Sequence, residues 1–517
     1  YEIASCLVGS EMCIRDRRIA KNTLYLYFRH ISVLLVGLYT SRVILQTLGV
    51  TDYGIYEAVG GVVGFLGFIN GALAGGASRF ITFAIGKGDE KETERTFTTT
   101  LTIHIILGIL LAIIMETAGI WMIYNKFLFP ADRLDSAVWA LHFSVLTMAI
   151  GVSQVPYSAC LQAHERFDIT AYVAIADIVL RLLVAILIQY FGSDKLIFFA
   201  LLLCLQNVGI MMFYRWFCSS RYQEAKFRLT INKKIFRSIA TFSTWGLVYN
   251  FVYTLNQQGT TILFGWFFLP PVLAAKAISV KVNSMTTQFI GQFRAAANPQ
   301  IVMTYAQANY GEFKRLILMS AKYSFFIMWI MTLPICLLTT PLLHLWLGEV
   351  PEYTVIFVQL IMIDSLFWLF DVSFYQGIIA TGNVKKNTIY TCILNFMRFP
   401  IVYIFFSLGF SPVSSFIISI AFGACIGLIL KPYLLRQLIN FPWKDFTHIY
   451  ISCIGVALIS AIVPYCMTYI VNVNNISGFC IVGFLSVLSS AITIFYLGIE
   501  KTHKEKITAI IINKLRK

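Results

Sequence analysis

Long apolar runs alternate with short polar gaps along nearly the whole chain of 517 residues. A helix of roughly 20 mostly apolar residues crosses a bilayer core about 30 Å thick, so the pattern predicts about fourteen membrane-spanning helices. The longest gap, residues 218–237, is too short to hold a soluble domain. The spans are expected at about 24–48, 54–85, 97–123, 138–163, 169–192, 195–217, 238–267, 271–307, 316–346, 353–381, 387–408, 411–438, 447–471 and 476–498.

The composition supports an all-α polytopic membrane protein. Hydrophobic residues make up 58% of the chain and charged residues only 13%, whereas a soluble domain carries about 25% charged residues. Such an apolar excess needs lipid to cover it. The 11 cysteines lie mostly inside apolar runs, and no CxxC pair or Cys/His spacing suits zinc. Neither a metal site, a cofactor nor a disulfide is therefore expected.

The net charge of +15 is concentrated in the gaps. Alternate gaps carry clusters of Lys and Arg, the largest within residues 218–237, whereas the intervening gaps offer only Lys126, Arg133 and Lys195. Positive charge marks cytoplasmic loops, where it also contacts anionic lipid. Both termini are accordingly expected in the cytoplasm, and a nucleic-acid partner is not expected.

The chain is expected to divide into two halves that repeat each other. The stretch Gly75–Ile81 (GGASRFI) is echoed by Ala295–Ile301 (AAANPQI), each closing the second long span of its half. An even number of spans separates the two, which predicts a parallel repeat related by an axis along the membrane normal. The expected parts are an adapter-derived segment at 1–17, six-helix bundles at 18–217 and 238–440, a basic cytoplasmic linker at 218–237, and two further spans with a basic tail at 441–517.

The first seventeen residues are excluded from the fold. Residues 7–17, LVGSEMCIRDR, look like a translated sequencing adapter and lack the apolar core of a signal peptide. The natural chain is therefore expected to begin upstream of Arg18.

Several of these segments resemble the multidrug/oligosaccharidyl-lipid/polysaccharide exporter superfamily, and within it the polysaccharide-unit flippases, or O-antigen translocases. The resemblance covers about residues 20–500 and is carried by four segments, SRVILQTLG (41–49) with DYGIY (52–56), ASRFIT (77–82), GKGD (86–89) and NPQI (298–301). It implies two six-helix bundles that form a V opening alternately to each face of the bacterial inner membrane, with two extra helices. It also implies a role in lipopolysaccharide assembly, an undecaprenyl-diphosphate-linked anionic oligosaccharide as substrate, and membrane lipids and polysaccharide polymerase machinery as partners.

The family offers no invariant motif that fixes a site here, so candidate residues come from charge. A charge at the bilayer centre costs about 3 kcal/mol or more and usually faces a cavity. The span 271–307 is the most polar, and we expect it to bind the diphosphate or acidic sugars; inter-helix pairing or snorkelling is the alternative reading, above all for Lys276 and Arg294 near its ends. The candidates on this span are Lys276, Lys281, Asn283, Thr287, Gln288 and Arg294.

Other spans add fewer candidates. Arg42 lies deep enough in the span 24–48 to face a lumen, and Asn256 and Gln257 suit either sugar hydroxyls or helix–helix hydrogen bonds. Asp177 and Arg181, four residues apart, predict an intrahelical ion pair.

The span 353–381 contains two acidic residues. Asp364 and Asp371 lie two turns apart, and Asp371 has no basic neighbour in its own span. An unpaired membrane carboxylate is readily protonated, so these two, with Asp177, are candidates for ion coupling.

The rival functions are weaker. No GxxxxGK[ST], HExxH or GxSxG motif occurs, so an enzyme is not expected. A cation-coupled multidrug antiporter of the same superfamily is the main alternative, but its cavity should be acidic rather than basic. Lipid II translocation is a third possibility.

Overall fold

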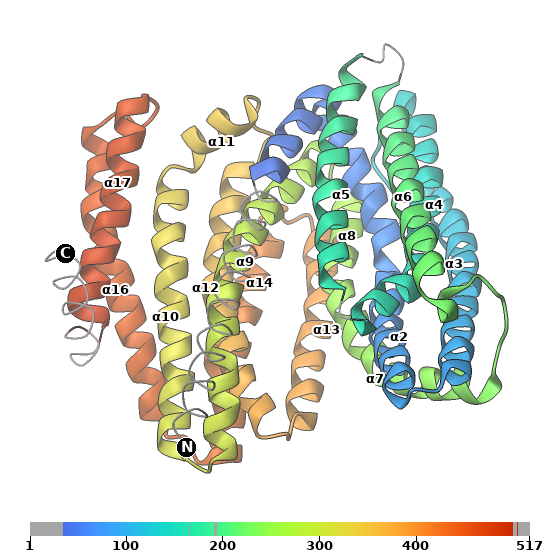
Figure 1. Cartoon of the computed structure of the whole chain (residues 1–517). Helices are drawn as coiled ribbons and strands as arrows, with labels where there is room; N and C mark the ends of the chain where they lie inside the picture. The colour runs from blue at the N-terminus through green and yellow to red at the C-terminus, as the bar shows by residue number, and fades with distance from the viewer. Residues whose placement is uncertain (1–34, 165, 191–193, 500–503, 505–517) are drawn as a thin grey trace, which may run out of the picture. The chain divides into compact units, whose positions relative to one another are not determined.

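The computed structural model describes residues 35–164, 166–190, 194–499 and 504 (Figure 1). Every regular element within these ranges is helical, which confirms the all-α prediction. The adapter-like residues 1–17, the first part of the span 24–48 and most of the basic tail lie outside the described residues.

Eleven described helices are long and apolar enough to cross a membrane, and they overlap eleven of the predicted spans, with bounds that differ most at the predicted 54–85. The other three predictions, 24–48, 238–267 and 271–307, stay predictions. The first is described only from residue 35, the second contains a π-helical turn at Leu255–Gly259, and the third carries many polar side chains.

Outward-facing apolar side chains indicate lipid contact. On α3 (Glu90–Asn125), Ile106, Ile109, Leu110 and Ile113 recur at helical spacing and are each more than half exposed. Such a stripe would be unfavourable in water and is favourable against acyl chains. With the eleven candidate helices, it identifies a multi-pass membrane protein.

The chain forms two compact units, one ending at Asn250 and one beginning at Phe251. The boundary falls within α7 (Lys233–Thr254), past the predicted linker at 218–237. The first unit contains a helical stretch over residues 35–65, α2 (Gly67–Lys87), α3, α4 (Leu134–Ala163), α5 (Phe167–Leu187), α6 (Lys195–Arg221) and most of α7. The second contains α8 (Thr260–Phe267), α9 (Pro270–Ala306), α10 (Tyr310–Leu337), α11 (Thr339–Leu347), α12 (Thr354–Ala380), α13 (Lys385–Ser407), α14 (Ser414–Ala424), α15 (Lys431–Ile439), α16 (Trp443–Ile470) and α17 (Ile476–Thr493).

In the first unit, α4 packs between α3 and α6 (Figure 1). The helical stretch 35–65 changes direction at Gly49, whose φ of 79° lies in the left-handed region. Glycine adopts this conformation without steric cost and commonly ends a helix. Asp52 follows this bend, in the first helical turn of the next segment.

Part of the predicted linker is fastened to α3. The side chain of Thr102 donates to the carbonyl of Thr230 (3.2 Å), and the amide of Asn232 donates to the side chain of Thr99 (3.1 Å). Arg228 also pairs with Glu94, 2.5 Å apart. This segment is thus an ordered part of the first unit.

In the second unit, α12 packs against α9, α10, α14 and α15. Gly423 and Gly427 let α12 approach closely, because a Cβ at Gly427 would lie 2.7 Å from the carbonyl oxygen of Phe367. Small residues four apart allow such contact between membrane helices. The two helices beyond the predicted bundle, α16 and α17, pack on α10 (Figure 1), where the indole of Trp329 donates to Ser460 (2.8 Å).

Candidate functional site

Several polar side chains of α9 contact other helices of the second unit. The ammonium of Lys276 donates to the hydroxyl of Thr261 on α8 (2.6 Å) and lies 5.0 Å from the centre of the Phe264 ring. The side-chain oxygen of Asn283 accepts a hydrogen bond from Ser365 on α12 (2.5 Å). For these two residues the structure therefore shows the inter-helix contacts that were the alternative reading of the sequence.

The other α9 candidates differ in their surroundings. Thr287 hydrogen-bonds carbonyls of its own helix, Lys281 is half-buried, and Gln288 is exposed. Arg294 is buried, with 8% of its surface exposed, and its guanidinium donates to the carbonyl of Val372 on α12 (3.3 Å). Arg294 thus brings a positive charge into the helix packing of the second unit.

A second buried cation, Lys431, lies nearby in the same unit. Its ammonium is 3.0 Å from a carboxylate oxygen of Asp371, donates to Asn387 (2.6 Å) and lies 4.7 Å from the centre of the Tyr375 ring. Asp371 therefore has a cationic partner, supplied by α15, and the expectation that it is unpaired is wrong. The sequence signal was present, since Lys431 interrupts the apolar run of the span 411–438.

The carboxylate of Asp371 interacts with a second cation besides Lys431. It also interacts electrostatically with Arg294, so the group of Arg294, Asp371 and Lys431 carries one net positive charge when all three are ionised. We call these three residues the buried cationic group. Its three residues come from α9, α12 and α15, which explains why no local sequence pattern identified the group.

Asp364 has different surroundings from Asp371. One of its carboxylate oxygens would lie 3.1 Å from a Cβ at Gly423, so α14 covers it. It interacts electrostatically with Arg398 on α13, but no residue that the structure describes forms an ion pair with it within 4.0 Å. Its coupling role stays a prediction.

The π-helical turn Leu255–Gly259 holds two further candidates. The side-chain amide of Asn256 donates to the carbonyl of Asn395 on α13 (2.8 Å), whereas Gln257 is exposed. Single π-helical turns are frequent at functional sites because they re-aim side chains. Asn256 thus stabilises the packing of the turn, and Gln257 is available to a ligand.

The candidates of the first unit are also located. Asp177 and Arg181 form the predicted intrahelical ion pair (3.1 Å), and Gln206 of α6 donates to the same carboxylate (2.7 Å). Arg42 is half-buried. The predicted pair is confirmed, and it anchors α5 on α6.

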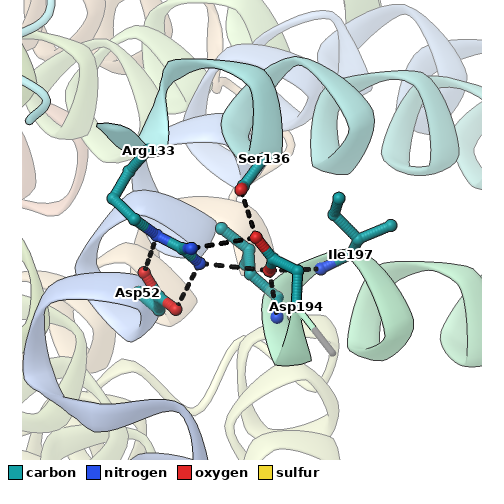
Figure 2. A network of polar contacts seen from close by, with 6 residues as sticks. Asp52, Arg133, Ser136, Asp194 and Ile197 are labelled. Carbon is teal, nitrogen blue, oxygen red and sulfur yellow. Dashed lines mark hydrogen bonds and ion pairs between the residues drawn. The ribbon is translucent and has the colours of Figure 1, made fainter. Parts of the chain in front are cut away.

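An arginine that the sequence assigned only to a gap joins three connections of the first unit. Arg133 donates two hydrogen bonds to Asp52 (2.6 and 2.9 Å) and two to Asp194 (2.9 and 3.1 Å), as Figure 2 shows. Ser136 also donates to Asp194, which caps α6 through the amides of Leu196 and Ile197. The helical segment that follows Gly49 and the starts of α4 and α6 are thereby held together.

The two carboxylates of this network differ in their electrostatics. Burial raises the pKa of Asp52 in spite of Arg133. At Asp194, burial is outweighed by hydrogen bonds from Ser136 and Arg133, which hold its pKa below the usual value. Asp194 is therefore the more firmly ionised partner of Arg133.

Two hollows on the first unit are lined by cations. One of about 720 Å³ is lined by Ser78, Arg79, Thr82 and Gln162, with Ser78 donating to Gln162 (3.4 Å). A second, of about 730 Å³, is lined by Lys233, Lys234 and Arg237 at the start of α7. Both suit anionic ligands better than cationic ones.

Many apolar spans with charged groups kept among them are typical of a transporter, because a buried charge is costly unless function requires it. The chain matches the family described as "Polysaccharide biosynthesis protein" over residues 43–355 and belongs to that family. No curated protein matches the chain.

Solved structures share the fold. One is the lipid II flippase MurJ in an inward closed conformation, with a TM-score of 0.66 and 15% identity, covering 92% of this chain and 99% of that chain. Another is an inward-facing multidrug resistance MATE family transporter of the MOP superfamily, with a TM-score of 0.63 and 14% identity, covering 80% of this chain and 98% of that chain. A third is a MOP superfamily transporter from Pyrococcus furiosus Vc1 with reverse polarity of the binding pocket. Its TM-score is 0.53 and its identity 14%, and the match covers 79% of this chain and 95% of that chain. Identities this low show the fold alone. The family match, together with this fold, supports the resemblance seen in the sequence and a membrane transporter or flippase.

Proposed function

We propose that this protein moves undecaprenyl-diphosphate-linked oligosaccharide units across the bacterial inner membrane by alternating access. The proposal rests first on membership of the polysaccharide biosynthesis family. The observation that carries it further is the excess of positive charge inside the second unit, where Lys431 pairs with Asp371 and the same carboxylate acts electrostatically on the buried Arg294. An anionic substrate would balance this charge.

The residue types fit the chemistry of such a substrate. A guanidinium can form paired hydrogen bonds with phosphate oxygens, and an ammonium attracts them as a point charge. Lys281, Gln288 and Gln257 are at least partly exposed and suit the hydroxyls and acidic groups of sugars. In this scheme, Arg294 and Lys281 attract the diphosphate while the neutral groups contact the glycan.

The orientation in the membrane belongs to the same proposal. The basic gaps, among them residues 218–237, face the cytoplasm, and both termini lie on that side. The substrate is then taken up from the leaflet in which lipid-linked sugars are assembled. Polymerase machinery on the other face would receive it.

Proteoliposomes test the proposal directly. Fluorescent undecaprenyl-diphosphate-linked oligosaccharide is placed in one leaflet, and its arrival in the other is followed by quenching from outside. We expect the unaltered protein to accelerate this transfer and the double variant Lys281→Ala/Arg294→Gln to reduce the rate at least tenfold. Glutamine keeps a donor for the carbonyl of Val372 while removing the charge.

The matched control is Arg315→Gln, which removes a charge from an exposed pair with Glu312 on α10. It should transfer substrate at the unaltered rate. In cells, the double variant should abolish surface polysaccharide at normal protein levels. Equal transfer by the double variant and the unaltered protein would refute the role of these cations.

A cation-coupled multidrug antiporter is the second candidate, favoured by the carboxylate of Asp364 on α12, which forms no ion pair within 4.0 Å among the described residues. In the same proteoliposomes, a pH gradient would then drive uptake of drug cations, and Asp364→Asn would lose this uptake. That result would support the antiporter. Lipid II serves as a third substrate in the leaflet assay. Transfer of lipid II in preference to other lipid-linked sugars would assign the protein to peptidoglycan precursors.

A further inference from the structure

Three potential metal ligands meet at the end of the first unit opposite to Arg133, and a fourth lies in the same buried cluster. Cys160, His164 and Glu224 each offer one ligand atom, and these atoms lie within 4.8 Å of one another. Cys218 is buried in the same cluster as Cys160, and its thiol donates to the carbonyl of Tyr157 (3.7 Å). Two thiols, an imidazole and a carboxylate form a donor set that suits Zn²⁺.

The helices bring these donors together from distant parts of the chain. Cys160 lies in the last turn of α4, and His164 follows four residues later at its end, so both fall on one face. Cys218 lies in the last turn of α6, and Glu224 lies in the short 3₁₀ turn Gln223–Ala225 that follows. No CxxC or similar spacing arises, which is why the sequence alone predicts no metal site.

The distances among Cys160, His164 and Glu224 fit a tetrahedral ion after small movements. With zinc–ligand bonds of about 2.0–2.3 Å, neighbouring ligand atoms of a tetrahedral site are about 3.5 Å apart. The imidazole Nε2 of His164 is now 2.7 Å from the carboxylate of Glu224, so this pair would open by less than about 1 Å. Side-chain rotations are sufficient for such a shift.

The surroundings also resemble those of a structural metal site. Cys160 and Cys218 are fully buried in an apolar cluster that includes Tyr157 and Ala225. The ring of Tyr222 stacks on that of His164, with centres 3.9 Å apart, and fixes its orientation. His164 and Glu224 keep 25% and 15% of their side chains exposed, which leaves a path for an ion. An apolar shell with oriented imidazole increases metal affinity.

We propose that Cys160, His164, Cys218 and Glu224 bind one Zn²⁺ ion in the first unit. The ion joins the end of α4 to the end of α6 and to the start of the 218–237 segment. The opposite ends of the same two helices are joined by Arg133, so each end of the α4–α6 pair is fixed by polar bonds. The proposal does not depend on which substrate the protein carries.

Metal analysis of the purified full-length protein tests this directly. The protein is stripped with a chelator under reducing conditions, equilibrated with Zn²⁺, desalted and analysed by mass spectrometry for zinc per chain. We expect about one zinc ion per chain, and a fall of at least tenfold in zinc affinity for Cys160→Ala and Glu224→Gln. Co²⁺ in place of Zn²⁺ should give the absorption of a cobalt–thiolate bond, which Cys160→Ala should abolish.

Matched controls come from the same unit. Glu116→Gln alters a second His–Glu pair, with His142 (2.8 Å), which forms no metal-ligand group with a cysteine in the part of the chain that the structure describes. Cys204→Ala removes another buried cysteine of α6. Both should keep the zinc and the cobalt signal. Glu224→Gln keeps the size and shape of the side chain and is expected to fold. It therefore still tests the proposal if Cys160→Ala fails to fold.

Three results would overturn the proposal. One is less than a tenth of a zinc ion per chain in the unaltered protein. Another is equal zinc in the unaltered protein and Glu224→Gln. The third is a Cys160–Cys218 disulfide in the protein purified without reductant, together with no uptake of zinc after reduction.

Discussion

The ammonium of Lys431 on α15 lies 3.0 Å from the carboxylate of Asp371 on α12, and the lysine side chain is only 2% exposed. Two charges in such surroundings stabilise each other, but either one alone is unfavourable. The pair therefore makes the packing of α12 against α15 depend on charge neutralisation.

Replacement of Lys431 by Met should destabilise the protein by up to about 3 kcal/mol, because the half-buried carboxylate of Asp371 would lose its nearest cation. The double variant Lys431→Met/Asp371→Leu should recover most of the loss. Unfolding of the detergent-solubilised protein measures both. Arg315→Met, in an exposed pair, should change stability by no more than about 1 kcal/mol. A single variant as stable as the unaltered protein would show that the pair contributes little.

The two acidic residues of α12 should differ in transport. If transport is proton-coupled, Asp364→Asn should remove its dependence on a pH gradient, because no described residue forms an ion pair with Asp364 within 4.0 Å. In the double variant Lys431→Met/Asp371→Leu, transport should still depend on the pH gradient. Proteoliposomes with imposed gradients give the comparison, and coupling that survives Asp364→Asn would exclude this carboxylate.

Arg133→Lys should destabilise the first unit by about 1–2 kcal/mol, because an ammonium cannot replace the paired hydrogen bonds to Asp52 and Asp194. The control is Arg166→Lys, whose arginine makes the same paired contact with Asp168 but on the surface. Thermal unfolding should separate the two variants. Equal unfolding temperatures would mean that the network of Figure 2 does not join the three connections tightly.

Gly427→Ala should be destabilising by about 1–3 kcal/mol, since the added methyl group would meet the backbone of Phe367 on α12. Gly455→Ala on α16 is the matched change, because nothing lies within 4 Å of its Cβ position. That variant should be neutral or slightly more stable, as alanine favours helix. A neutral Gly427→Ala would indicate that α12 and the turn after α14 can separate without loss.

The helices and the membrane assignment followed from sequence because they depend on local composition. Apolar runs of sufficient length predicted eleven of the candidate spans that the structure contains. The Asp177–Arg181 pair was predicted for the same reason, since residues four apart on a helix are always neighbours.

The contacts of the candidate sites did not follow in this way. Arg133 lies 81 residues from Asp52 and 61 from Asp194, and Lys431 was one lysine within an apolar run. The sequence identified the span 271–307 as polar, but it did not show which neighbours its side chains contact. In the structure, Lys276 and Asn283 contact α8 and α12.

By itself, the sequence determined that this chain forms many apolar helices in a membrane and that it resembles exporters of lipid-linked sugars. Only the tertiary structure decided which polar groups meet, giving Asp371 its partner Lys431 and bringing Cys160 to His164 and Glu224. The physical reason is that spacing along one helix is fixed by backbone geometry, whereas the distance between two helices is set by the packing of side chains along their whole length.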